Sequence, residues 1–85
     1  MNKEMKARVA RAICFTFEEI APDLEAALSE GERLDLETAV ESTLSAYRVK
    51  AFGEDDEAAD ALYELDSWED MYDLAREALK SHFYF

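Results

Sequence analysis

Apolar residues recur every three or four positions along most of this chain, the spacing typical of amphipathic helices. The first such stretch runs from about Lys3 to Ile20, and its apolar stripe comprises Met5, Val9, Ala12, Ile13, Phe17 and Ile20. Because the residue before a proline avoids helical geometry, Pro22 is predicted to end this helix. A second, short helix is predicted from Pro22 to about Glu30, with Gly31 as its left-handed terminator.

Three more helices are predicted in the remainder of the chain. The third begins after Asp35, a good N-cap, and ends at Gly53. The fourth begins near Asp55 or Asp56, and the fifth follows the capping-box sequence Asp66-Ser67-Trp68-Glu69. Their apolar faces comprise Leu36, Ala39, Val40, Thr43, Leu44, Tyr47 and Ala51 in the third, Ala58, Ala61, Leu62 and Leu65 in the fourth, and Trp68, Met71, Tyr72, Ala75, Ala78, Leu79, His82 and Phe83 in the fifth.

These patterns predict an all-α fold, a small compact bundle of four to five helices in a single domain spanning residues 1–85. Only two glycines and one proline are present, too few for the many turns of a sheet protein. The last residues, 81–85, are the one place where an extended tail is expected. The predicted core comprises Val9, Ile13, Phe17, Val40, Leu44, Tyr47, Leu62, Trp68, Tyr72 and Leu79.

The formal net charge of -12 narrows the possible partners. It disfavours binding to nucleic acid or to an anionic membrane, and it favours a basic partner. A hydrophobic content of 49% and an aromatic content of 12% exclude a disordered acidic tail. The single cysteine, Cys14, excludes a disulfide within the chain and fits a reducing compartment, so a cytoplasmic location is expected. The segment after the basic N-terminus carries Arg8 and Arg11, so it has no apolar h-region and no signal peptide is expected.

The acidic residues are concentrated in one part of the chain. Residues 54–73 contain ten Asp or Glu and no Lys or Arg. One interpretation is a solvated surface that keeps the protein soluble. The other is a negative platform that docks on a basic protein surface. On that second interpretation the candidate partner-binding residues are Asp55, Asp56, Asp60, Glu64, Glu69, Asp70 and Asp73.

Two further groups of residues have more than one interpretation. The bases of the first helix are expected to lie against the acidic remainder of the chain, with a dimer contact and nucleic-acid binding as alternatives; they are Lys3, Lys6, Arg8 and Arg11. Phe15, Tyr63 and the terminal segment 83–85 are difficult to bury all at once. Either a neighbouring helix covers them, or they are aromatic anchors for a partner or for a homodimer.

No catalytic, cofactor or metal site is predicted. His82, the only histidine, is expected to interact with the dipole at the end of the last helix. Cys14 is expected to be a core or boundary residue. The acidic run 55–60 lacks the central glycine and the alternate acidic spacing of an EF-hand loop. A non-enzymatic role is therefore expected.

Two resemblances suggest functions. Asp66-Ser67-Trp68 resembles the Asp-Ser-Leu signature of acyl carrier proteins, which implies a carrier modified on Ser67. In size, acidity and lack of motifs, the whole chain is similar to small phage-encoded inhibitors such as anti-CRISPR proteins and other DNA mimics, and to acidic immunity proteins. That similarity implies an inhibitor whose acidic surface binds a basic, nucleic-acid-handling target. A structural or regulatory protein that homodimerises is the alternative, and a small carrier or immunity protein comes third.

Overall fold

The computed structural model describes residues 1–49, 55–65 and 67–85. Within these ranges the chain forms helices α1 (Lys3–Ala26), α2 (Leu36–Val49), α3 (Asp56–Tyr63) and α4 (Trp68–His82), and no strand. The predicted all-α fold is confirmed. The predicted ends of the third helix, Ala51 and Gly53, lie outside the described residues, as does Asp66.

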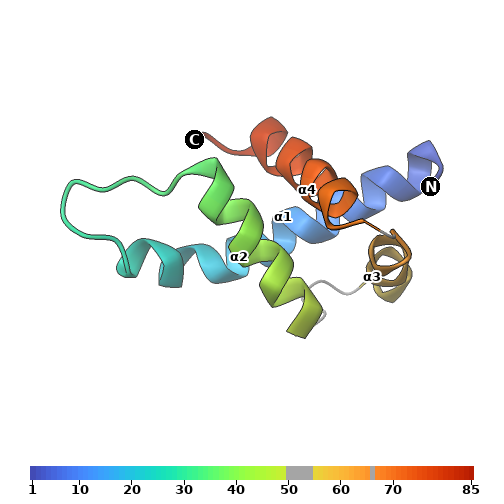
Figure 1. Cartoon of the computed structure of the whole chain (residues 1–85), viewed down its shortest axis with the longest axis horizontal. Coiled ribbons are helices and arrows are strands. Elements are labelled where there is room, and N and C mark those ends of the chain that lie inside the picture. Colours follow the sequence, from blue (N-terminus) through green and yellow to red (C-terminus); the bar gives the residue numbers. More distant parts are fainter. Residues whose placement is uncertain (50–54, 66) are drawn as a thin grey trace.

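Helix α1 is the central element of the bundle (Figure 1). It runs along the long axis of a molecule measuring 41 × 21 × 20 Å. Helices α2 and α4 pack against α1 and against each other, and α3 packs mainly against α1. In Figure 1 α3 lies beside the N-terminal end of α1, whereas the connection between α1 and α2 extends from the opposite end.

Side-chain caps fix where the helices begin. The side chain of Asp35 accepts a hydrogen bond of 2.7 Å from the amide of Thr38, and Asp55 caps α3 through the amide of Ala58 at 3.2 Å. The Ser67 hydroxyl caps α4 by accepting from the amide of Asp70 at 3.4 Å. Asp35 is the cap that the sequence predicts, and Asp55 and Ser67 are each one of two candidate residues at the start of their helices. A fourth, Asn2, caps α1 by accepting from the amide of Met5 at 2.7 Å.

The prediction that Pro22 ends the first helix is wrong, because α1 continues through it to Ala26. Proline removes one helical hydrogen bond, the one to the carbonyl of Glu18. Glu18 is exposed, so water can satisfy this carbonyl. Leu24, beyond the proline, still packs against the core, and this contact stabilises the helix past Pro22. The separate helix predicted over 22–30 does not form, and Gly31, with φ of +86°, lies in the connection 27–35 instead.

The core lies where α1, α2, α3 and α4 converge. Its fully or almost fully buried predicted members are Val9, Ile13, Phe17, Val40, Leu44, Tyr47, Leu62 and Leu79. Tyr72 is half-buried against this cluster. The prediction for Trp68 is wrong: it is the first residue of α4, and 44% of its surface is exposed. The fully buried part of α4 begins two turns later at Ala75, and Trp68 in the first turn lies at the edge of the core.

The aromatic residues off the main stripes are only partly covered. Phe15 is exposed, so the expectation that a neighbouring helix covers it is wrong. Tyr63 is also exposed, although its hydroxyl donates a hydrogen bond to the carbonyl of Tyr47. After α4 the chain becomes extended at Phe83, as expected for the tail. The rings of Phe83 and Phe85 pack on Phe17, with centroid separations of 4.9 and 5.7 Å, and Tyr84 is fully exposed.

Candidate protein-binding surface

Arg8 joins the basic first helix to the acidic part of the chain. Its Nε and Nη2 donate to the two carboxylate oxygens of Asp55 at 2.7 and 2.5 Å, and its Nη1 donates to Glu57 at 3.0 Å. A bidentate pair of this kind fixes geometry as well as charge. For Arg8, the prediction that these bases lie against the acids of the same chain is confirmed. Asp55 thus both caps α3 and holds that helix against α1.

The electrostatics of this pair give stability a pH dependence. The hydrogen bonds from Arg8 hold the pKa of Asp55 below its ordinary value, and the amide of Ala58 adds to this effect. A carboxyl group whose pKa is lower in the folded state contributes stability at and above its unfolded pKa, about 4. That contribution is lost as the pH falls through the lowered folded pKa.

We expect Arg8→Gln to lower the melting temperature at pH 7, and the difference from wild type to shrink as the pH falls through the lowered pKa of Asp55, where that carboxyl group becomes protonated. Thermal melts between pH 2 and pH 7 measure this. Arg11→Gln is the matched control because Arg11 is exposed and the change in net charge is the same. Equal effects of the two substitutions at pH 7 would show that only net charge matters and that the pair contributes nothing.

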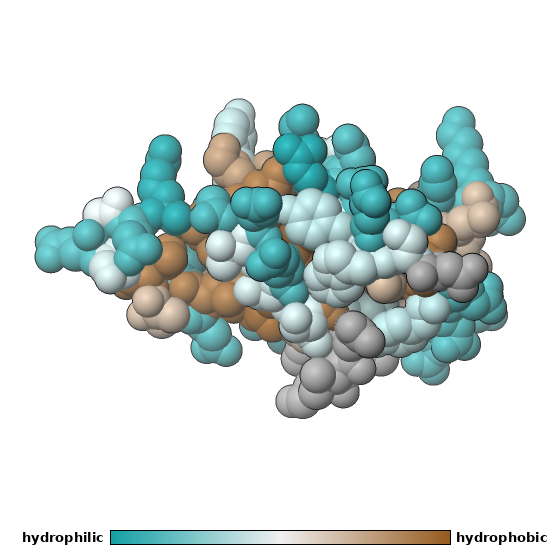
Figure 2. Space-filling view, in the orientation of Figure 1, coloured by the Kyte–Doolittle hydropathy of each residue, from teal (hydrophilic) through white to brown (hydrophobic). Residues whose placement is uncertain are grey.

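Two shallow depressions share Met1 and Leu65 at the end of the molecule where α1 begins. The first, of about 480 Å³, lies between the start of α1 and α3 and is also lined by Met5 and Ala61. The second, of about 570 Å³, includes residues of α4, with Leu74 as a further apolar member. We call the two depressions together the acid-flanked groove. Apolar surface emerges between hydrophilic side chains at this end of the molecule, at the right of Figure 2.

Each depression is bordered by a row of three carboxylates. The rows are Glu57, Asp60 and Glu64 on α3, and Asp70, Asp73 and Glu77 on α4. Both rows have the spacing i, i+3, i+7, which keeps them on one side of a helix over about 10 Å. All six residues are exposed. One basic side chain, Lys6, lines the second depression. The groove therefore combines an apolar floor with strongly negative edges.

The structure brings together part of the predicted partner-binding set. Asp60, Glu64, Asp70 and Asp73 line the acid-flanked groove. Asp56 and Glu69 are exposed, but neither is among the residues lining the two depressions. Asp55 is instead engaged by Arg8 within the chain.

Sequence reasoning left two carboxylates out of the candidate set, Glu57 and Glu77, which complete the two rows. The repeated i, i+3, i+7 spacing is the signal that identifies them. The apolar floor gives no comparable signal, because Leu65 falls between two helices and Met1 precedes the first.

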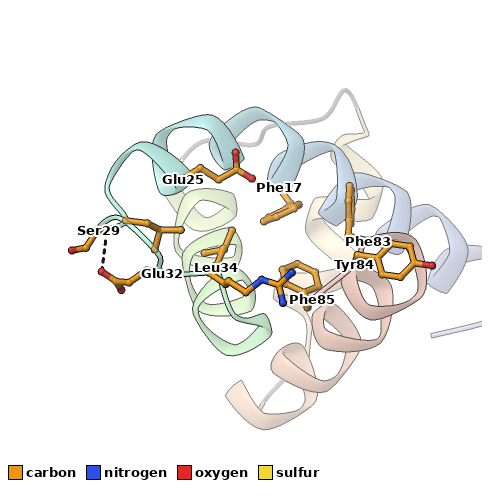
Figure 3. A pocket seen from close by; sticks show the side chains of 10 residues that line it. Phe17, Glu25, Ser29, Glu32, Leu34, Phe83, Tyr84 and Phe85 are labelled. Atoms are coloured by element: carbon orange, nitrogen blue, oxygen red, sulfur yellow. Dashed lines mark hydrogen bonds between the residues drawn. The ribbon is translucent and has the colours of Figure 1, made fainter.

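A larger depression of about 700 Å³ lies at the end of the molecule that holds the connection 27–35 (Figure 3). Phe17, Phe83 and Phe85 form its aromatic wall, and Leu34 faces them from the connection. The carboxylate of Glu32 accepts from the amide of Ser29 at 2.9 Å and so closes a turn at the rim. This is the aromatic surface that the homodimer alternative requires.

Cys14 and His82 do not have the features of a catalytic pair. The Cys14 thiol donates to the carbonyl of Ala78 at 3.6 Å. Burial, with the charge of Glu18 adding to it, raises its pKa to about 11, so the thiol is protonated at neutral pH. His82 is exposed in the last turn of α4. Within residues 1–49, 55–65 and 67–85, no group of three or more His, Cys, Asp or Glu is placed to hold a metal ion.

In comparisons with known proteins, no family model, curated protein or solved structure matches the chain. None of the helices in the described part of the chain has the length and apolar content needed to cross a membrane.

Proposed function

We propose that this protein is a non-enzymatic binding module that docks on a basic, nucleic-acid-handling protein and inhibits it. The observation that carries the proposal is the acid-flanked groove, in which six carboxylates border an apolar floor, Lys6 is the one basic side chain that lines it, and Glu57 is paired with Arg8. A solvated surface needs only dispersed charge. An apolar centre with a charged rim is the arrangement of a protein interface.

The two components have different roles in binding. The carboxylate rows attract a basic surface and accelerate its approach, and this effect weakens as salt increases. The apolar floor supplies affinity that persists once the surfaces meet, through burial of Met1, Leu65 and Leu74. Arg8 supports the site indirectly by holding α3, with its row, against α1.

The rows also support a target that ordinarily binds phosphates. Along a helix axis the spacing i, i+3, i+7 separates successive carboxylates by about 4.5 and 6 Å. One DNA strand carries a phosphate charge every 3.4 Å or so along its axis. A groove in the target that binds a phosphate backbone through Lys and Arg can therefore bind these carboxylate rows, whose negative charges have a similar but slightly wider spacing. Occupation of such a groove excludes the nucleic acid.

The test uses a groove variant with Asp60→Asn, Glu64→Gln, Asp70→Asn, Asp73→Asn and Glu77→Gln. All five residues are exposed, and their neutralisation relieves self-repulsion, so the fold is expected to remain intact. The matched control also removes five exposed acids, but from the other half of α1 and the connection: Glu18→Gln, Glu19→Gln, Asp23→Asn, Glu25→Gln and Glu30→Gln.

The assay measures how each protein displaces a DNA duplex from a panel of purified basic DNA-binding domains at low and at high salt. We expect the wild type and the control to displace DNA from at least one domain at low salt. We expect the groove variant to be at least about tenfold weaker, because several charges are lost from one interface. Equal displacement by the groove variant and the control would show that the acids act only through net charge. Absence of displacement from every domain would refute the proposed target class.

A further inference from the structure

We propose that the α1–α4 side of the acid-flanked groove binds an amphipathic helix of the target. This helix carries Lys or Arg along one edge of its apolar face. This inference rests on the proposed function and specifies the form of the partner. It concerns the depression lined by Met1, Lys6, Leu65, Leu74 and the carboxylate row of α4.

This side of α4 has apolar surface that is only partly covered by the rest of the protein. Leu65 and Leu74 pack against the core and remain half-exposed, and Met1 beside them is exposed. Helices α1 and α2 pack against two other sides of α4. An apolar strip between two helices is the place where a further helix adds to a bundle, with its side chains seated in the groove.

The carboxylates along the groove are complementary in charge to a row of basic side chains on a partner helix. Leu74 is surrounded on α4 by Asp70, Asp73 and Glu77, at positions i−4, i−1 and i+3 relative to it. A helix laid alongside α4 presents its own side chains at the same axial steps, about 4.5 and 6 Å for positions i, i+3 and i+7. An extended strand presents same-face side chains every 6.7 Å or so and falls out of step with the row. A helix therefore matches the row better than a strand does.

The two walls of the groove differ in charge. Its α4 wall carries three carboxylates, whereas its α1 wall carries Lys6. A helix with basic residues on both edges would bring like charges together at Lys6. The fitting partner therefore places Lys or Arg on the edge that faces α4 and a neutral or acidic residue on the edge that faces Lys6. This asymmetry fixes the rotation of the partner helix about its own axis.

The experiment compares three stapled or linear peptides of identical composition. The first is a helix with leucines on one face, lysines on one edge and glutamates on the other. The second has the same residues in an order that destroys the amphipathic pattern, and the third keeps the first sequence with a central D-residue pair that prevents helix formation. We expect the first peptide to bind at least about tenfold more tightly than the other two at physiological salt, because only it aligns both apolar burial and charge.

A charge exchange locates the binding site without disturbing the core. Asp73→Lys with Glu77→Lys should reduce binding of the first peptide about tenfold or more, and a peptide with glutamates in place of its lysines should recover it. Both residues are exposed, and Glu19→Lys with Glu25→Lys is the matched control with the same change in charge. Recovery only in the groove variant supports the inference.

Equal binding of the three peptides would overturn the inference. The same loss and recovery of peptide binding in the control pair would also overturn it. So would a failure of all three peptides to bind. The DNA-displacement assay separates these results from failure of the proposed function. A protein that displaces DNA from basic domains but does not distinguish the peptides still has the proposed function, with a partner of another form.

Discussion

Replacement of Ile13 by alanine is expected to lower the free energy of unfolding by about 2–5 kcal/mol, the range for a large aliphatic residue lost from a packed core. Ile13 is fully buried at the middle of α1, the helix that contacts all three others. A domain of this size has a total stability of only about 5–10 kcal/mol. The substitution should therefore remove a large fraction of it. Urea unfolding followed by circular dichroism measures the change.

Trp68→Ala is the informative comparison for Ile13→Ala. Trp68 is the larger side chain, but 44% of it is exposed and it lies in the first turn of α4. Its loss is expected to cost about 1–3 kcal/mol, less than the loss of Ile13, because removal of a partly exposed side chain leaves no enclosed cavity. A larger effect for Trp68 than for Ile13 would mean that the core is centred nearer the start of α4 than the structure places it.

The double variant Thr43→Val, Tyr47→Phe is expected to raise the free energy of unfolding by about 1–3 kcal/mol, the desolvation cost of a buried polar group without a partner. Both hydroxyl groups are buried one helical turn apart on α2, and neither has a hydrogen-bond partner among the described residues. Burial also raises the pKa of Tyr47 to about 12. Valine and phenylalanine keep the shape of the side chains and remove the two oxygens.

Thr16→Val provides the control, because Thr16 is another fully buried threonine on a helix. Its hydroxyl donates to the carbonyl of Ala12 at 2.9 Å. Removing it loses a hydrogen bond, so a decrease of about 0.5–1.5 kcal/mol is expected. The double variant and Thr16→Val should therefore change the free energy of unfolding with opposite signs in the same urea experiment. A loss of stability in the α2 double variant would show that its hydroxyl groups are bonded in solution, for example to buried water.

The features that sequence reasoning predicted well are those set by nearby residues. Asp35, Asp55 and Ser67 cap helices because each side chain reaches an amide three positions along. The periodic stripes likewise identify the buried faces. The errors arise where tertiary contacts decide. The helix passes through Pro22 because Leu24 still has a core to pack on, and Trp68 is exposed because α4 begins before the core does.

The candidate site divides in the same way. Its carboxylates are visible in the sequence as an acidic stretch, and their helical spacing places them on one side of each helix. Their convergence on Met1 and Leu65 depends on how α3 and α4 dock against α1, and α3 is held there by Arg8, which reaches Asp55, 47 positions away. Periodicity within one helix contains no information about such a contact. The spacing of the acids was predictable, therefore, and the groove was not.

The central position of α1 has a consequence for how the chain is synthesised. Among the four helices, α1 is synthesised before α2, α3 and α4, which all pack against it, and α4 is synthesised after the other three. Until then the stripe of Val9, Ile13 and Phe17 has no complete set of partners. The nascent chain thus carries an uncovered apolar face on α1 until α4 has been synthesised, a state open to chaperones and to aggregation. The core is complete only after α4 has left the ribosome.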